Sequence, residues 1–175
     1  MSIRPYKKIM PTLGEDVYVD EQACVIGDVT LGDDSSVWPC AVVRGDVNTI
    51  RIGSRTNIQD NSMLHVTHKN EEFPDGFALT IGDDVTVGHN VVLHACTINN
   101  RCLIGMGAVV LDGAVLEEHV MIGANSLVPP GKVLESGYLY LGSPVKQIRP
   151  LTEKEIAHFE YSAKHYAKLK DDYLV

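Results

Sequence analysis

The stretch "IGMGAVVLDGAVLEEHVMIGANSLV", Ile104 to Val128, carries an apolar residue at every sixth position, and this spacing decides the fold class. An α-helix would repeat its apolar residues every 3.6 positions, and a β-sandwich would show longer strands separated by hairpin turns. The same six-residue spacing runs through most of the chain, at Leu31, Val37 and Val43, at Ile52, Ile58 and Leu64, at Ile81, Val87 and Leu93, and at Ile98, Ile104, Val110, Leu116, Ile122, Val128, Leu134 and Tyr140. The sequence therefore predicts hexapeptide repeats.

A hexapeptide accommodates one short strand and one turn, so three repeats form a triangular coil of about 18 residues. We predict an all-β solenoid, a parallel β-helix, over residues 1–150, with clear coils from about Asp20 to Pro144. Glycine follows the repeated apolar residue at several corners, where we expect its tolerance of unusual backbone angles to matter. These glycines are Gly53, Gly82, Gly88, Gly105 and Gly123.

Residues 151–175 differ in character from the repeats. Thr152 is followed three residues later by Glu155, which is the pattern of a capping box at the start of a helix. Apolar residues then recur on one stripe, at Ile156, Phe159, Ala163, Tyr166 and Leu169. The segment is predicted to form a C-terminal amphipathic α-helix.

The composition indicates one acidic domain. The chain has 175 residues, of which 45% are hydrophobic, enough for a substantial core, and its formal charge is −8. An acidic surface does not attract a nucleic-acid backbone or an anionic membrane, so neither is a predicted partner. The start of the chain has no signal-peptide core and no apolar run could span a bilayer, so we expect a cytoplasmic protein.

Two histidines occupy the same place within their hexapeptides, because His65 follows the repeat residue Leu64 and His94 follows Leu93. Their separation along the chain is longer than one coil. The excess equals the length of the segment 68–78, "HKNEEFPDGFA", whose composition is that of an inserted surface loop. Without the loop, His94 lies one coil above His65. Neighbouring coils are about 4.8 Å apart, close enough for two imidazoles to bind one metal ion.

His89 does not share that corner. It comes two positions after Val87, in the preceding hexapeptide, and so faces a different side of the triangle. If it is a metal ligand, it must come from another subunit, as a three-fold trimer would allow. Three histidines with an open fourth position form the zinc arrangement that leaves room for a reactive water. The alternative is that the histidines are unrelated core or surface residues.

Several motifs of the chain resemble those of the gamma-class carbonic anhydrase family, most closely its shorter enterobacterial branch. They are "RGD" at Arg44–Asp46, "NIQDNSMLH" at Asn57–His65, "VGHNVVLH" at Val87–His94 and "YSAKHY" in the C-terminal segment. The resemblance implies a left-handed β-helix that assembles as a homotrimer, with a metal site at each subunit interface. It implies zinc, or else iron or cobalt, bound by the residues His65, His89 and His94.

The resemblance also implies roles for other residues. Gln59 would contact a metal-bound hydroxide and Asn57 would orient Gln59, while Tyr166 of the helix would lie near the site. Three further residues match ion pairs at the interface, namely Arg44, Asp46 and Asp60.

Two glutamates of the family pattern are replaced here, one by Val47 and one by His68. The resulting hypothesis is reversible hydration of carbon dioxide to bicarbonate by metal-bound hydroxide, with weak activity because proton export depends on His68 or on buffer. A second hypothesis is a hexapeptide acyltransferase, in which one histidine acts as a general base. A third is a non-catalytic, metal-stabilised trimeric binding module.

Overall fold

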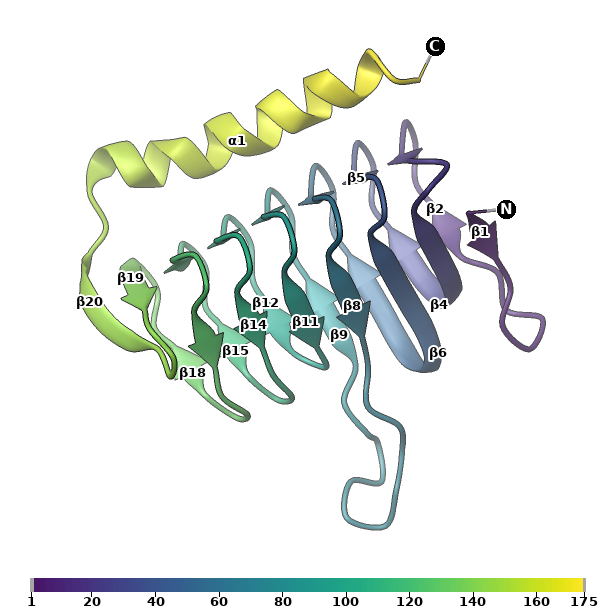
Figure 1. The fold of residues 1–175 in the computed structure, drawn as a ribbon, viewed down its shortest axis with the longest axis horizontal. Coiled ribbons are helices and arrows are strands. Elements are labelled where there is room, and N and C mark those ends of the chain that lie inside the picture. The colour runs from purple at the N-terminus through teal and green to yellow at the C-terminus, as the bar shows by residue number, and fades with distance from the viewer. Residues whose placement is uncertain (1, 175) are drawn as a thin grey trace.

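Short parallel strands wind into stacked, three-sided coils, and one helix lies along the outside of the stack (Figure 1). The computed structural model describes residues 2–174. The first face carries β3 (Tyr18–Val19), β5 (Ser36–Val37), β7 (Asn57–Ile58), β10 (Thr86–Val87), β13 (Leu103–Ile104), β16 (Met121–Ile122) and β19 (Tyr138–Leu141), with β20 (Lys146–Pro150) paired antiparallel to β19.

The other two faces belong to one sheet. The second face carries β1 (Ile3–Arg4), β8 (Met63–His65), β11 (Val92–His94), β14 (Val109–Val110) and β17 (Leu127–Val128). The third face carries β2 (Thr12–Leu13), β9 (Leu79–Ile81), β12 (Thr97–Ile98), β15 (Val115–Leu116) and β18 (Val133–Leu134). The long strands β4 (Cys24–Leu31) and β6 (Val42–Ile52) contribute to both the second and the third face, because their halves pair with strands of each.

The repeated apolar residues form the core. Those from Ile98 to Leu134 are fully buried, and Tyr140 at the end of the series is 3% exposed. Parallel pairing stacks each on its equivalent one coil away, as in Val87 beside Ile104 and Ile104 beside Ile122. Each fully buried aliphatic side chain contributes about 1.5–3 kcal/mol of hydrophobic stabilisation. The predicted parallel solenoid of hexapeptide repeats is confirmed.

The coils begin earlier in the chain than the predicted start near Asp20. Strands β1, β2 and β3 precede Asp20 and pair in parallel with β4 and β5, so they belong to the stack. The six-residue spacing in fact reaches back from Leu31 through Val25 and Val19 to Leu13, so the pattern itself extends into these strands and a start near Asp20 is too late.

The corner glycines have a different purpose from the one expected. Gly53, Gly82, Gly88, Gly105 and Gly123 do not have positive φ angles. A Cβ on Gly105 would lie 2.6 Å from the backbone of Gly123 and Ala124 in the next coil. A side chain is excluded at Gly53, Gly82, Gly88 and Gly105 because the backbone of the neighbouring coil lies so close, whereas at Gly123 the nearest atom belongs to the side chain of Leu141. The left-handed turn positions are different ones, and they hold both polar residues and other glycines. The polar ones include Asp34, Arg55, Asn61, Asp84, Asn90, Arg101, His119 and Asn125, and the glycines include Gly107, Gly113, Gly131 and Gly137.

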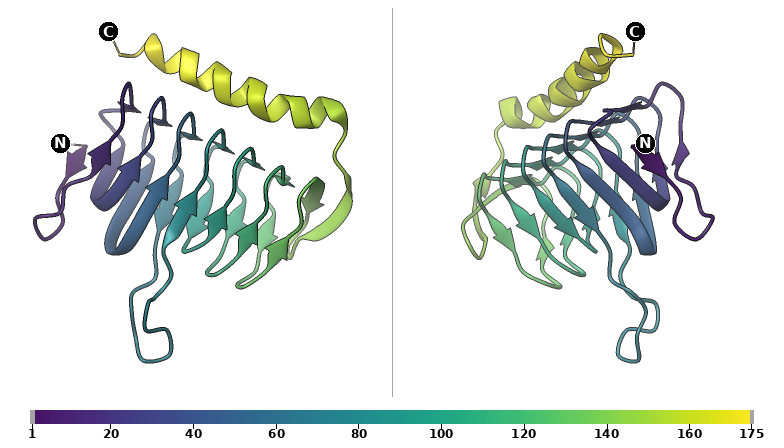
Figure 2. Two further views of the ribbon diagram at one scale, coloured as in Figure 1. Left: turned by 180° about the vertical axis from the view of Figure 1, so that it is seen from behind. Right: turned by 45° about the vertical axis from the view of Figure 1, so that its right-hand side comes forward.

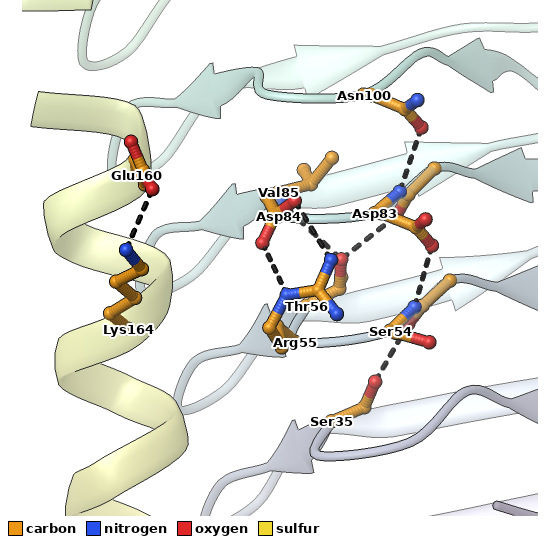
Figure 3. A network of polar contacts seen from close by, with 12 residues as sticks. Ser35, Ser54, Arg55, Thr56, Asp83, Asp84, Val85, Asn100, Glu160 and Lys164 are labelled. Carbon is orange, nitrogen blue, oxygen red and sulfur yellow. Dashed lines mark hydrogen bonds and ion pairs between the residues drawn. The ribbon is translucent and has the colours of Figure 1, made fainter. Parts of the chain in front are cut away.

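Polar contacts connect the turns of successive coils beside the helix (Figure 3). Arg55 donates two hydrogen bonds to the carboxylate of Asp84, at 2.6 and 3.0 Å. The backbone N–H of Ser54 donates to the Asp83 carboxylate at 2.8 Å. Such pairs fix the stacking of coils at this edge.

The helix α1 (Glu153–Asp171) begins with the predicted capping box, formed by Thr152 and Glu155. It runs along the first face toward the N-terminal coils (Figures 1 and 2). Its packing differs from the predicted stripe, because Ile156 is exposed whereas Ser162 and Lys170 are buried. Ser162 shares a hydrogen bond of 2.8 Å with Thr86, and Lys170 pairs with Asp34 at 3.1 Å. Within residues 2–174, no helix has the length and apolar composition that crossing a membrane requires.

The segment 68–78 forms a loop that projects away from the coils (Figures 1 and 2). It connects β8 to β9, and its base is closed by an antiparallel bridge between Thr67 and Phe77, with backbone hydrogen bonds of 2.9 and 3.1 Å. The coil above it continues in register, since Leu93 pairs with Leu64.

Replacing His68–Gly76 by Asn-Gly should leave the coil stack intact. The two residues would close the Thr67–Phe77 pair with a type I′ turn, and a surface loop changes stability little with length. We expect unchanged circular dichroism and a thermal midpoint within a few degrees of the native value. A collapse of the fold or of the assembly on this replacement would show that the loop is structural.

Candidate metal centre

Adjacent strands of the second face bring His65 and His94 together. The Cα register of β8 and β11 pairs the two residues directly. Leu64 and Leu93 precede the two histidines and point into the core. Successive side chains of a strand point to opposite sides, so both imidazoles point outward from the same corner. Nδ1 of His65 lies 3.2 Å from Nε2 of His94.

Each of these imidazoles also contacts an aspartate through its other nitrogen. Nε2 of His65 lies 3.0 Å from Oδ1 of Asp46, and Nδ1 of His94 lies 2.6 Å from Oδ1 of Asp112. Burial alone would raise the pKa of both carboxyl groups. Hydrogen bonds to the charged form have the opposite effect and outweigh burial, so the pKa of each carboxyl is lowered. Asp46 accepts these bonds from His65 and Arg44, and Asp112 accepts them from Thr67 and His94.

An ionised aspartate beside an imidazole determines which ring nitrogen carries the N–H. A carboxylate accepts hydrogen bonds, so the outer nitrogen of each ring carries the N–H. The two inner nitrogens, Nδ1 of His65 and Nε2 of His94, then direct lone pairs at one another. This arrangement is unfavourable unless a cation or a proton lies between them.

The donor set fits a metal ion. Nitrogen ligands of a tetrahedral zinc ion with Zn–N bonds of about 2.0–2.1 Å lie about 3.3 Å apart. The observed separation of 3.2 Å between the inner nitrogens of His65 and His94 is close to that value. Ring N–H groups donated to carboxylates are the usual outer contacts of metal-binding histidines.

His89 lies at another edge of the coil. It follows β10 of the first face, and its Nδ1 lies 2.9 Å from Oδ2 of Asp60, leaving Nε2 directed elsewhere. Its side chain is 43% exposed. Within the described part of this single chain, residues 2–174, no group of three or more His, Cys, Asp or Glu side chains is placed to hold one ion. The chain therefore brings together two of the three predicted ligands.

The structure brings Asn57 and Gln59 of the first face together with Tyr166 of α1. Gln59 donates from Nε2 to Oδ1 of Asn57 at 3.0 Å, and Asn57 donates to Oγ1 of Thr86 at 3.1 Å. Burial raises the pKa of Tyr166 and a contact with Gln59 opposes that rise. Gln59 and Tyr166 also line a groove of about 490 Å³ between the first face and α1. His89 lies at the same edge as Gln59, because β7 and β10 are paired.

The remaining predicted residues have separate positions. Arg44 and Asp46 form an ion pair within the chain, whereas Asp60 contacts His89 and is not part of that pair. His68 is exposed at the base of the loop. Asp112 was not predicted from the sequence, although it lies one full coil after His94.

The comparisons with known proteins agree with this fold. The family model described as bacterial transferase hexapeptide (six repeats) matches residues 10–45, 79–112 and 95–130. Protein YrdA of Escherichia coli is 62% identical over 172 residues, covering 98% of this chain and 94% of the relative. A carbonic anhydrase of Geobacillus kaustophilus is 42% identical, covering 95% of this chain and 87% of the relative.

A solved structure is also similar over nearly its full length. It is a putative acetyltransferase of Bacillus cereus, with 40% identity, a TM-score of 0.91, and coverage of 98% of this chain and 95% of the other. The names of these relatives thus include both an anhydrase and a transferase. The chain belongs to the hexapeptide-repeat family and, within it, to the group that includes YrdA and the gamma carbonic anhydrases.

Proposed function

We propose that the protein is a metal-dependent, carbonic-anhydrase-like enzyme that interconverts carbon dioxide and bicarbonate. The observation that carries this proposal is the pair of inner nitrogens on His65 and His94, which lie 3.2 Å apart and are each backed by an aspartate. Relatives named carbonic anhydrase at 42–47% identity support the same reaction.

The site would be completed by a second chain. His65 and His94 share the second face with a continuous column of outward apolar side chains, which we call the apolar stripe. It consists of Cys24, Val42, Met63, Val92, Val109 and Leu127. Met63 is 38% exposed although it lies two residues from His65. A second copy of the chain would bury this stripe. It would also bring the edge of its coil that carries His89 toward the pair of His65 and His94.

The residues of the chain then have distinct tasks. His65, His94 and the His89 of a neighbouring chain would hold zinc, with iron or cobalt as alternatives. When bound, zinc lowers the pKa of a coordinated water to about 7. Gln59, held by Asn57 and contacted by Tyr166, would orient the attacking water at the same edge as His89. Asp46 and Asp60 would keep the imidazoles of His65 and His89 oriented.

An acyltransferase is the second candidate, because the similar Bacillus cereus structure is a putative acetyltransferase. Such an enzyme needs one histidine as a general base and a groove for its acyl donor. That mechanism does not require two imidazole lone pairs that face each other. Tight binding of acetyl-CoA by a metal-free preparation would favour this candidate. A metal-bearing protein that neither hydrates carbon dioxide nor binds acetyl-CoA would favour the non-catalytic binding module.

Protein purified without air should contain about one metal ion per chain and should hydrate carbon dioxide. Elemental analysis measures the first and stopped-flow with a pH indicator the second. Each hydration releases a proton, and Val47 and His68 replace the family glutamates. Imidazole buffer should therefore raise kcat several-fold with little effect on kcat/KM, because proton release follows the chemical step.

Val47→Glu should raise kcat in weak buffer, since Val47 is exposed and directly follows Asp46. Val47→Gln is the matched control and should leave kcat unchanged, because an amide does not accept the proton. A native kcat that is already high and indifferent to buffer would contradict this account of proton export. Absence of metal from carefully prepared protein would contradict the proposed function itself.

A further inference from the structure

We propose that Asp112 is a positioning residue that holds His94 in the tautomer and orientation needed to bind a metal ion, and that Thr67 fixes Asp112 in that position. The inference rests on the proposed function, because it takes His94 as a metal ligand. It adds a residue that lies one coil away and does not itself touch the inner nitrogens.

Both carboxylate oxygens of Asp112 are occupied. Oδ1 accepts from Nδ1 of His94 at 2.6 Å, and Oδ2 accepts from the hydroxyl of Thr67. A carboxylate bound at only one oxygen could rotate about its terminal torsion. With the second oxygen tied to Thr67, the first is aimed at His94, and Nε2 of that ring is left as the free lone pair.

Thr67 is itself held firmly. Its backbone N–H and C=O both bond to Phe77 across the base of the loop, at 2.9 and 3.1 Å. Its carbonyl also accepts from Nδ2 of Asn48 at 3.1 Å. The hydroxyl of Thr67 therefore projects from a fixed backbone. The contacts form a continuous chain from Asn48 through Thr67 and Asp112 to His94.

Replacing Asp112 tests the positioning of a histidine ring more cleanly than replacing Asp46 or Asp60 would. Asp46 contacts His65 but also forms an ion pair with Arg44, so its replacement would leave a cation without its partner. Asp60 contacts His89 at a more exposed position. Among the side chains described, the Asp112 carboxylate has hydrogen bonds to the ring of His94 and to the hydroxyl of Thr67, and its replacement removes these two.

The test measures zinc affinity and ring tautomers in four variants, Asp112→Ala, Asp112→Asn, Thr67→Val and Asp75→Asn. Zinc affinity comes from competition with a chelator of known affinity, and tautomers come from ¹⁵N chemical shifts of the histidine rings in metal-free protein. We expect Asp112→Ala to weaken zinc binding about 10- to 100-fold. Asp112→Asn keeps an acceptor oxygen, so its zinc affinity should fall less than that of Asp112→Ala. The zinc affinity of Thr67→Val should fall about two- to five-fold.

Asp75→Asn is the matched control, because it removes a carboxylate from the exposed loop and should leave affinity unchanged. Native metal-free protein should show His94 protonated at Nδ1, and Asp112→Ala should shift this tautomer toward Nε2. Native affinity together with an unchanged His94 tautomer in Asp112→Ala would overturn the inference. If Asp112→Ala does not fold, the same two readouts on Asp112→Asn decide the question.

The proposed function and the role of Asp112 can be refuted separately. If native protein binds no zinc, the proposed function fails, but the tautomer of His94 still reports whether Asp112 positions that ring. If native protein binds zinc and Asp112→Ala binds it equally well, the proposed function stands and the role assigned to Asp112 does not.

Discussion

A Val109→Asp protein should sediment as a monomer of 19.2 kDa, whereas the native protein should sediment at three times that mass. Val109 lies in the middle of the apolar stripe, one coil beyond Val92 and on the same outward column. In a three-fold trimer the substitution places one unpaired carboxylate in each of three interfaces. Burying an unpaired charge costs several kcal/mol, and the cost is repeated at every interface.

The same substitution should remove metal. Val109 is not one of the polar partners of the histidine pair, which are Asp46 and Asp112, so loss of metal on this change would come from loss of the neighbouring His89. Elemental analysis of the monomeric fraction should show less than a tenth of the native metal content. Thr97→Asp is the matched control, because Thr97 is an outward residue of the third face, where it pairs with Thr80 and Val115. It should leave both mass and metal unchanged. Dissociation by Thr97→Asp, with Val109→Asp still assembled, would place the interface on the third face.

The coil architecture could be predicted because its determinants are local and repeated. A six-residue spacing fixes both the strand length and the direction of each side chain, so the burial of residues such as Ile104 and Ile122 followed from their positions alone. The loop could be recognised for the same reason, since the separation of His65 and His94 along the chain exceeds one coil by the length of the segment 68–78.

The contacts of the candidate site depend on more than spacing. The repeat indicates which residues share a corner, but the aspartate that each imidazole meets depends on side-chain torsions and on the neighbouring coil. Asp60 contacts His89 within the chain, which the spacing did not indicate, and its predicted ion pair at a subunit interface stays a prediction. Asp112 lies in a turn whose sequence carries no separate signal of a metal site.

The start of the helix could be predicted from the sequence, whereas its buried side could not. Its start follows from the capping box of Thr152 and Glu155, which involves only neighbouring residues. Its buried side could not be read from apolar spacing alone, because the first face offers polar partners at Thr86 and Asp34. Ser162 and Lys170 are buried against them, and Ile156 is left exposed.

Metal should reappear when two metal-free variants are unfolded and refolded together. If each site takes His65 and His94 from one chain and His89 from the next, a His89→Ala homotrimer and a His65→Ala homotrimer each lack one ligand at every site. Both should be nearly metal-free. Any mixed trimer, however, contains one interface at which the His89→Ala chain supplies His65 and His94 while the His65→Ala chain supplies His89.

The expected recovery of metal follows from the proportions of the trimers that form on random mixing. Random assembly of equal amounts gives mixed trimers in about three quarters of cases, each with one complete site of three, so about a quarter of the native metal content should return. Native mass spectrometry with a tag on one variant confirms that mixed trimers form. A mixture of His65→Ala and His94→Ala is the matched control. Because both of these ligands come from the same chain at each site, no mixed trimer of that pair has a complete site, and the mixture should stay metal-free. Recovery in the control, or none in the first mixture despite mixed trimers, would show that the ligands are not divided between chains in this way.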